Sequence, residues 1–320
     1  MSITLRLKKI EILLSTYNGE RYLREQLNSF VSLENYKDVK VLIRDDGSTD
    51  STRDILAEYR DNYGFEVIFG DNIGLSKSLH MLLLAADTEC EYFAFADQDD
   101  VWLPDKLSRA FDALSTTDNA LPNLYCARSS LTDKDLNIIG HTVIPKKPLS
   151  FYNAMLQNVA TGHTQVFNRP LLKLLSREFS EDIVMTDHWA YLLSSTVGQV
   201  IYDKKATTLY RQHGKNVIGY SHSAFSTLKT RIRRVFVGQL QEKTRQLTAF
   251  LECYGDDMAT AHKHELELFL DSQKSFFKRA SYLFKTQSYR QTAFETFIFR
   301  LMYLIGLYKA KRKKKKENKK

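Results

Sequence analysis

The stretch Tyr92-Phe-Ala-Phe-Ala-Asp-Gln-Asp-Asp-Val-Trp102 joins five apolar residues directly to three carboxylates that fall within four positions. Carboxylates this close together repel, and their pKa values rise unless a positive charge neutralises them. A divalent cation is the usual remedy, because Mg²⁺ and Mn²⁺ prefer hard oxygen ligands. The other interpretation is a solvated acidic turn that caps the following helix. If residues 92–96 form a strand, Asp97 and Asp99 point to one side and Gln98 to the other.

Two earlier stretches have the same layout. Val39-Lys-Val-Leu-Ile-Arg-Asp-Asp-Gly-Ser-Thr-Asp50 runs from an apolar, β-rich segment into paired carboxylates and a glycine turn. Ile10-Glu-Ile-Leu-Leu-Ser-Thr-Tyr-Asn-Gly19 again runs from a strand pattern into a polar turn. Ligands of open α/β sheets bind at the carboxyl ends of the strands. We therefore expect hydroxyl, amide and carboxylate groups to gather at one edge of a sheet.

Strand and helix patterns alternate from Ile10 to Phe95, which predicts a Rossmann-like, mainly parallel sheet flanked by helices. The expected strands are 10–14, 39–44, 66–69 and 92–96, and the expected helices are 20–31, 51–62 and 75–86. No G-x-G-x-x-G follows the first strand and no Walker A sequence occurs. After Trp102 the alternation loosens, and we expect helices at 105–114, 151–157 and 186–195 and strands at 123–129, 164–167 and 199–202.

The net charge of +8 is concentrated at the carboxyl end, because residues 309–320 hold nine basic residues and one acidic residue. We expect a catalytic domain over 1–220, a helical region over 221–308 that associates with a membrane or oligomerises, and a disordered polybasic tail over 309–320. Pairing of the Phe- and Tyr-rich helices would give a homodimer. The apolar segment 297–308 followed by the tail predicts docking on anionic lipid. A solubilising tail and a nucleic-acid patch are the alternatives.

The sequence lacks three features of secreted and membrane-spanning proteins, and their absence bears on the cellular location that we expect. The three cysteines are widely spaced and fit no disulfide framework. Residues 1–9 lack the apolar segment of a secretory signal, and no run of about 18 apolar residues predicts a spanning helix. We expect a cytoplasmic protein that is peripheral on the inner face of the cell membrane.

The motifs together resemble family 2 glycosyltransferases with the GT-A fold. The resemblance covers about residues 10–220. In detail the motifs are similar to those of the bacterial rhamnosyltransferase-like branch, which builds surface polysaccharides. The resemblance is carried by Ile-Leu-Leu-Ser-Thr-Tyr-Asn-Gly-Glu-Arg-Tyr-Leu (12–23), Leu-Ile-Arg-Asp-Asp-Gly-Ser-Thr-Asp (42–50), Asp-Asn-Ile-Gly-Leu-Ser-Lys-Ser (71–78), Ala-Asp-Gln-Asp-Asp-Val-Trp-Leu-Pro-Asp-Lys-Leu (96–107), Thr-Asp-His-Trp (186–189) and Leu-Tyr-Arg-Gln-His-Gly-Lys-Asn-Val-Ile-Gly (209–219). Related sequences often have His-Asp-Trp-Trp where this chain has Thr-Asp-His-Trp.

The resemblance implies an enzyme that inverts the anomeric carbon, uses Mg²⁺ or Mn²⁺, and takes its sugar from a nucleoside diphosphate sugar. TDP-rhamnose is the first choice of donor and a UDP-hexose the alternative, and the acceptor is a lipid-linked saccharide. The implied roles are catalytic base for Asp187, metal ligands Asp97, Asp99 and His213, donor contacts Ser15, Tyr17, Asp46, Lys77, Asp97 and Arg211, and acceptor contacts Asn158, Gly162 and Trp189.

Several of these residues have structural interpretations as well. Asp187 also fits a helix N-cap, and Lys77 a solvated helix face. His213 fits a structural histidine, and the tryptophans fit core packing as well as sugar stacking. Asp45 fits turn stabilisation through its side chain better than donor binding.

Other functions remain open from the sequence. The basic tail suits a nucleic-acid binder, although clustered acids disfavour one. A nucleotidyltransferase is a further alternative, because such enzymes share this type of sheet. A non-catalytic relative that binds a partner is another, and it would not need a catalytic base.

Overall fold

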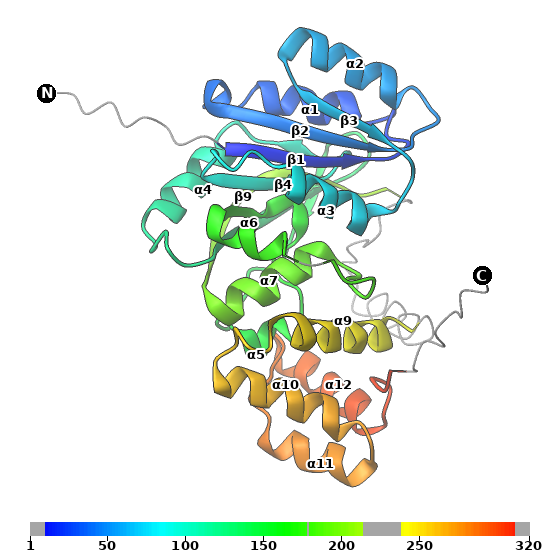
Figure 1. The fold of residues 1–320 in the computed structure, drawn as a ribbon, viewed down its shortest axis with the longest axis vertical. Coiled ribbons are helices and arrows are strands. Elements are labelled where there is room, and N and C mark those ends of the chain that lie inside the picture. The colour runs from blue at the N-terminus through cyan, green and yellow to red at the C-terminus, as the bar shows by residue number, and fades with distance from the viewer. Residues whose placement is uncertain (1–9, 178, 214–237, 311–320) are drawn as a thin grey trace, which may run out of the picture. The chain divides into compact units, whose positions relative to one another are not determined.

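The computed structural model describes residues 10–177, 179–213 and 238–310. Contacts divide the described residues into two units. The first contains residues up to 179 together with 185–213, and the second contains 180–184 together with 238–310. The boundary expected after residue 220 and the tail from 311 onward lie outside the described residues. Figure 1 draws the first unit from blue to green and the helices of the second from yellow to red.

Within the described residues of the first unit, nine strands form one sheet. Its order is β3-β2-β1-β4-β8-β6-β9-β5, and β7 pairs with β6. The strands are β1 (Ile10–Thr16), β2 (Val39–Asp46), β3 (Glu66–Gly70), β4 (Tyr92–Ala96), β5 (Val101–Trp102), β6 (Asn123–Thr132), β7 (Ile138–His141), β8 (Val166–Asn168) and β9 (Gln199–Arg211).

The first four strands are parallel, as the alternating pattern predicts. β1 lies between β2 and β4, and Leu14 is in register with Ile43 on one side and Ala96 on the other. All seven residues of β1 are buried, as expected of a strand whose two faces are both covered. This central position brings the ends of β1, β2 and β4 to one edge of the sheet.

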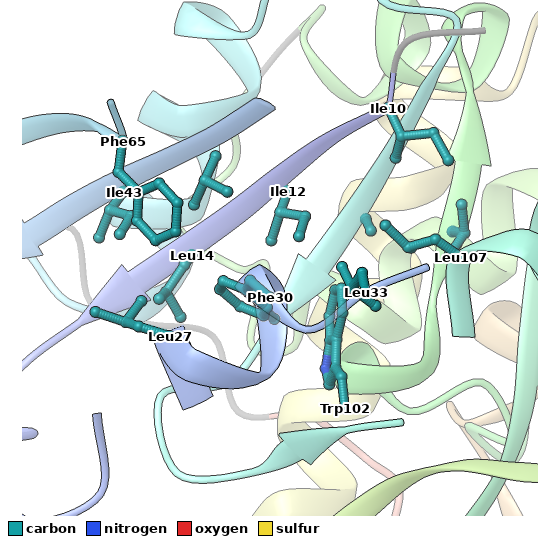
Figure 2. Close-up of a cluster of buried hydrophobic side chains, with 14 of the residues drawn as sticks. Ile10, Ile12, Leu14, Leu27, Phe30, Leu33, Ile43, Phe65, Trp102 and Leu107 are labelled. Carbon is teal, nitrogen blue, oxygen red and sulfur yellow. The ribbon is translucent and has the colours of Figure 1, made fainter. Parts of the chain in front are cut away.

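Helices cover both faces of this sheet. Side chains of β1 that are two residues apart share a face, and Ile10, Ile12 and Leu14 pack in one core cluster with Leu27 and Phe30. Figure 2 shows Leu14, Leu27 and Phe30 close together between the strand and the helix. The helices on this face are α1 (Leu23–Val31), α2 (Thr52–Tyr63) and α4 (Lys106–Ser115). Against the sheet elsewhere pack α3 (Leu75–Ala85), α6 (Arg169–Leu175) and α7 (Thr186–Val197).

The second half of the unit departs from the expected elements. β9 is expected over 199–202 but continues to Arg211, because its Thr- and Tyr-rich second part pairs in parallel with β6 and antiparallel with β5. β5 and β7 have two and four residues, too short for a periodic pattern to indicate them. α6 is likewise not predicted, although Asn168 caps it and a proline follows. Short helical turns occur at η1 (Tyr36–Asp38), α5 (Phe151–Ala154) and η2 (Gly162–Thr164).

The second unit contains α9 (Gln239–Tyr254), α10 (Thr260–Ser272), α11 (Phe276–Lys285) and α12 (Ala293–Leu304). Its core is rich in aromatic rings, and the Phe269 and Tyr303 ring centroids are 5.0 Å apart. Glu265 is buried there and accepts hydrogen bonds from the hydroxyls of Tyr282 and Ser288. Among the described residues, no helix combines the length and the apolar content needed to cross a bilayer.

Candidate active site

The polar turns after β1, β2 and β4 meet at one edge of the sheet, as expected. Thr16 is in register with Asp45, and the Thr16 hydroxyl donates to the Asp45 carboxylate over 3.4 Å. Asp45 also accepts from the backbone N–H of Ser48 and from Arg53. Asp45 therefore holds its own turn together, which is the structural interpretation of this residue.

Gln98 fastens the acidic run to the first turn. Its side-chain oxygen accepts from the Tyr17 backbone N–H at 2.9 Å, and its side-chain nitrogen donates to the Tyr17 carbonyl at 3.2 Å. A Cβ added at Gly19 would lie 2.6 Å from the Gln98 oxygen, so only glycine leaves this room. The Tyr17 side chain is 47% exposed beside this clamp.

Ser15 and Asp46 belong to one buried network at the start of α3. The Ser15 and Ser78 hydroxyl oxygens are 2.6 Å apart, and Arg44 donates to Ser78 and to Asp46. The Asp46 carboxylate also accepts from the backbone N–H groups of Ile73 and Gly74, at 3.0 and 2.9 Å. Asp46 thus fixes the loop that leads into α3.

Two further positions frame the same loop. Gly47 has a φ of +81°, and a Cβ there would come within 2.7 Å of the Asn72 backbone nitrogen. The turn therefore requires a residue without a side chain. Lys77, in the first turn of α3, lies with its ammonium 6.0 Å from the Phe179 ring centroid.

Asp97, Asp100 and His163 form a compact cluster. One ligand atom of each lies within 4.8 Å of the others, and His163 Nδ1 is 3.6 Å from a carboxylate oxygen of either aspartate. Asp97 is about half exposed and Asp100 is fully buried. Among the described residues, Asp100 Oδ2 has no hydrogen-bond partner. A buried carboxylate oxygen in that condition is costly unless something positive approaches it.

Burial raises the pKa of Asp100, and Asp97 and Asp99 raise it further while His163 opposes them. Burial alone would lower the pKa of His163, but the facing carboxylates of Asp100 and Asp97 outweigh burial and raise it. Lys106 is buried beneath the cluster and donates to the His163 carbonyl at 2.9 Å. Burial lowers the pKa of Lys106 to about 7. The cluster thus combines two carboxylates with His163 and the buried Lys106, and their pKa shifts reflect both burial and their mutual charges.

Asp99 faces a different partner. Its carboxylate is 2.7 Å from His213 Nε2, and the His213 ring stacks on Tyr22 with centroids 5.2 Å apart. Burial and the neighbouring Asp97 raise the pKa of Asp99, and the hydrogen bond from His213 opposes that rise. The structure therefore brings together the aspartate and the late histidine that the sequence names as metal ligands.

Arg211 is fully buried instead of open to a ligand. Its guanidinium donates to the Asp99 carbonyl at 3.0 Å and to the Lys134 carbonyl, and it pairs with Glu25 at 2.5 Å. It also lies 4.3 Å from the Tyr22 ring centroid. These contacts give the guanidinium a structural role, and the expected contact of Arg211 with donor phosphate stays a prediction. Arg211 holds the backbone of the acidic run in place.

Asp187 lies in the first turn of α7 with its carboxylate held on both oxygens. Oδ2 accepts from Asn158 Nδ2 at 2.8 Å and from the Gly162 N–H at 3.1 Å, and Oδ1 accepts from the His188 N–H at 2.7 Å. Burial raises the pKa of Asp187 to about 6, with a contribution from the negative charge of Asp97. A partly exposed carboxylate with this pKa is equipped to accept a proton near neutral pH.

Two of the expected acceptor contacts are thus partners of Asp187, because Asn158 and Gly162 both donate to it. Trp189 is 1% exposed and Trp102 is 2% exposed, so both tryptophans pack in the interior. His188 is also buried, and its Nε2 is 2.7 Å from the Ala154 carbonyl oxygen.

His163 is the residue that sequence reasoning missed. It follows Gly162 in the chain, and its Nε2 is 2.9 Å from the Ser129 hydroxyl. A lone histidine outside the recognised motifs gives no signal by itself. The sequence signal for His163 is its position directly after Gly162, which the resemblance assigns to the acceptor side.

Comparison with known proteins agrees with this geometry. The sequence model of the family described as Glycosyl transferase family 2 matches residues 11–182. The dTDP-rhamnosyl transferase RfbG of Shigella flexneri is 26% identical over 262 residues, which cover 76% of this chain and 85% of RfbG.

Two solved structures share the fold. The S. aureus TarS 1–349 complex with UDP-GlcNAc has a TM-score of 0.57 at 16% identity, covering 94% of this chain and 89% of that one. A Pyrobaculum calidifontis mannosyltransferase in complex with GDP-Man and Mn²⁺ has a TM-score of 0.50 at 16% identity, covering 94% and 86%. The expected GT-A fold is confirmed. The family model spans more than half of the chain, and the chain therefore belongs to glycosyltransferase family 2 and is a glycosyltransferase.

Proposed function

We propose that this enzyme transfers a sugar with inversion from a nucleoside diphosphate sugar, with Asp187 as the general base and a divalent cation at the acidic run. The observation that carries the proposal is the setting of the Asp187 carboxylate. Three N–H donors fix its orientation, its pKa is raised to about 6, and Asp97 is close enough to influence that pKa. A rigidly held base at the rim of an acidic cluster suits in-line attack by an acceptor hydroxyl.

Asp187 takes the proton of the attacking hydroxyl. With a pKa of about 6, the carboxylate is mostly ionised at pH 7 yet still basic enough to accept a proton. Asn158 and Gly162 occupy one oxygen and hold the carboxylate plane, which leaves acceptor capacity on the oxygens for the substrate hydroxyl. One base is sufficient, because a diphosphate leaves without being protonated.

The residues of the acidic run fit a divalent cation. Carboxylate oxygens suit Mg²⁺ and Mn²⁺. The buried Asp100 Oδ2 has no hydrogen-bond partner among the described residues and faces His163 Nδ1 at 3.6 Å, so a cation could satisfy this oxygen. Asp97, Asp99 and His213 would hold the ion, with Asp100 and His163 facing it from the buried side. When bound, the cation neutralises charge that develops on the departing diphosphate.

Donor binding is assigned to the network at the start of α3. Ser15 and Asp46 are buried there, and the exposed Tyr17 ring and Lys77 lie on segments that border it. The carboxylate of Asp46 already fixes residues 73 and 74. Its role in the proposal is to shape the donor pocket and to offer a remaining lone pair to the nucleoside.

TDP-rhamnose is the first donor to test, because the RfbG relative is named for dTDP-rhamnosyl transfer. A UDP-hexose is the second candidate, because TarS with the same fold is described in complex with UDP-GlcNAc. The proposed acceptor is a lipid-linked saccharide at the inner face of the cell membrane.

The test is a donor panel on the purified full chain. We expect release of a nucleoside diphosphate from one donor with Mn²⁺ or Mg²⁺, and loss of release in EDTA. Each donor is also scored by the rise in melting temperature that it causes. Release of pyrophosphate would identify a nucleotidyltransferase instead. Failure of every nucleotide sugar to raise the melting temperature in the presence of metal would contradict the proposal.

A further inference from the structure

Charge is divided unevenly within the helical unit. Residues 239–272, which contain α9 and α10, hold seven acidic and three basic residues. Residues 273–310, which contain α11 and α12, hold seven basic residues and one acidic residue, Glu295. The unit therefore has an acidic half and a basic half.

The exposed apolar side chains fall in the same basic half. Among the described residues of α9–α12 and their connections, every exposed large apolar side chain lies between positions 276 and 305. On α11, Phe277 is 83% exposed and Phe284 is 92% exposed. These two residues are seven positions apart, which places them on one stripe of the helix. The exposed Lys278 and Lys285 follow them directly and form a parallel basic stripe.

α12 has a similar stripe. Phe297, Leu301 and Ile305 are spaced by four residues and are 61%, 48% and 58% exposed, and the exposed Arg300 lies beside them. These side chains are not needed for the core. Tyr282 of α11 and Phe299 and Tyr303 of α12 are buried on other faces of the same helices.

We propose that the apolar and basic stripes of α11 and α12 form a docking surface for an anionic lipid membrane. Exposed phenylalanine, leucine and isoleucine enter the boundary between headgroups and acyl chains, while lysine and arginine remain at the phosphate level. This surface would bring the enzyme to a lipid-borne acceptor, and in that respect the inference rests on the proposed function. Docking on the membrane can be measured without any sugar transfer.

Two other occupants fit the surface less well. In a two-fold dimer the same patch meets itself, so the basic residues of two copies, Lys278, Lys285 and Arg300, would be brought into one interface with no acidic partner among the exposed residues of the stripes. A nucleic acid would match the charge and could stack on phenylalanine. The aliphatic side chains of Leu301 and Ile305 would not contribute to nucleic-acid binding in this way, because they have no ring to stack on a base.

The experiment is co-sedimentation of the full chain with vesicles of phosphatidylcholine alone and of phosphatidylcholine with about one-third phosphatidylglycerol. We expect pelleting with the anionic vesicles that weakens as salt is raised. The double variant Phe277→Ser/Phe284→Ser should reduce the partition coefficient at least tenfold, and Lys278→Glu/Lys285→Glu should remove the preference for anionic lipid. Ile138→Ser, which changes a 59% exposed side chain in the first unit, is the matched control and should bind like the wild type.

The affected side chains are exposed, so circular dichroism and the melting temperature should be unchanged in these variants. Equal pelleting of wild type and Phe277→Ser/Phe284→Ser would overturn the inference. A wild type that stays in the supernatant would also overturn the inference. If that wild type forms a dimer that Phe277→Ser/Phe284→Ser breaks, the surface is a dimer interface. If it retains DNA that the double variant releases, the surface binds nucleic acid. Asp187→Asn should still pellet, and the docking variants should still release nucleoside diphosphate in solution. Membrane docking and sugar transfer can therefore fail separately.

Discussion

Asn158 Nδ2 donates a hydrogen bond to Asp187 Oδ2 across 2.8 Å, although the two residues are 29 positions apart in the chain. The bond joins the segment after α5 to the first turn of α7, and the Gly162 N–H reaches the same oxygen. Burial raises the pKa of this carboxylate, and the three N–H donors, which stabilise its ionised form, offset only part of that rise. The resulting pKa of about 6 suits the proposed role of Asp187 as a general base near neutral pH.

Replacement of Asp187 by asparagine should lower kcat by about 10²–10⁴, because the acceptor proton loses its base. Donor binding, followed as the donor-induced rise in melting temperature, should be retained. The control is Asp135→Asn, which changes an exposed carboxylate paired only with the neighbouring Lys134 in the described contacts. Full turnover by Asp187→Asn would exclude this residue as the base.

The pH profile of the wild type should have an acid limb near pH 6. A carboxylate with a raised pKa is protonated below that value, so kcat/KM should fall about tenfold per pH unit below it and level off above it. The measurement is initial rate at low donor and acceptor concentration from pH 4.5 to 8.5. A limb near pH 4 would mean that burial does not act on the catalytic base as the structure indicates.

Asn158→Ala should move this acid limb upward. The substitution removes a donor that favours the ionised carboxylate, and a hydrogen bond to a charged group contributes about 1.5–3 kcal/mol, so we expect a shift of about one pH unit or more. Gly162→Ala is the matched control. Its added Cβ would make ordinary contact with the Asp187 Cβ at 3.4 Å while keeping the N–H. An unmoved limb in Asn158→Ala would separate Asn158 from the base.

Gln98→Ala should raise the KM for the donor about fivefold or more, because it removes the two hydrogen bonds to the Tyr17 backbone, each contributing about 0.5–1.5 kcal/mol. Gly19→Ala should have a similar effect, because its Cβ would displace the Gln98 side chain. Residues that act through one contact are non-additive. The double variant should therefore be no worse than the more affected single variant, and full additivity would refute the shared clamp.

His213→Ala and Asp99→Asn should each weaken Mn²⁺ binding by about tenfold or more, measured by metal titration against the melting temperature and by the metal dependence of donor release. His141→Ala is the control, because this exposed histidine on β7 contacts Ser130 and has no described contact with Asp97, Asp99 or Asp100. Unchanged Mn²⁺ affinity in both variants, with loss in His163→Ala, would move the ion to the Asp97, Asp100 and His163 cluster.

The sequence predicted the first half of the sheet well, because β1 to β4 alternate with amphipathic helices and end in recognisable polar turns. It assigned Asp99 and His213 to one metal site only through family resemblance, and their direct contact across 114 positions is a finding of the structure. The burial of Arg211 was not predictable, because its partners Glu25 and the Lys134 carbonyl are brought to it by the fold. Periodicity marked Phe297–Tyr308 as one apolar segment but did not separate the buried Phe299 and Tyr303 from the exposed Phe297 and Leu301.

The network around Arg211 also has a consequence for biosynthesis. The side chain links α1, the acidic run and the turn after β6, and its backbone N–H donates to Asp100. Among the described strands β5 pairs only with β9, so Val101 and Trp102 can form their strand pairs only when residues 208 and 209 are present. Contacts across so many positions form late and slowly. During synthesis the acidic run is therefore made 111 positions before Arg211, and the contacts that hold it in the structure can form only once β9 has been translated.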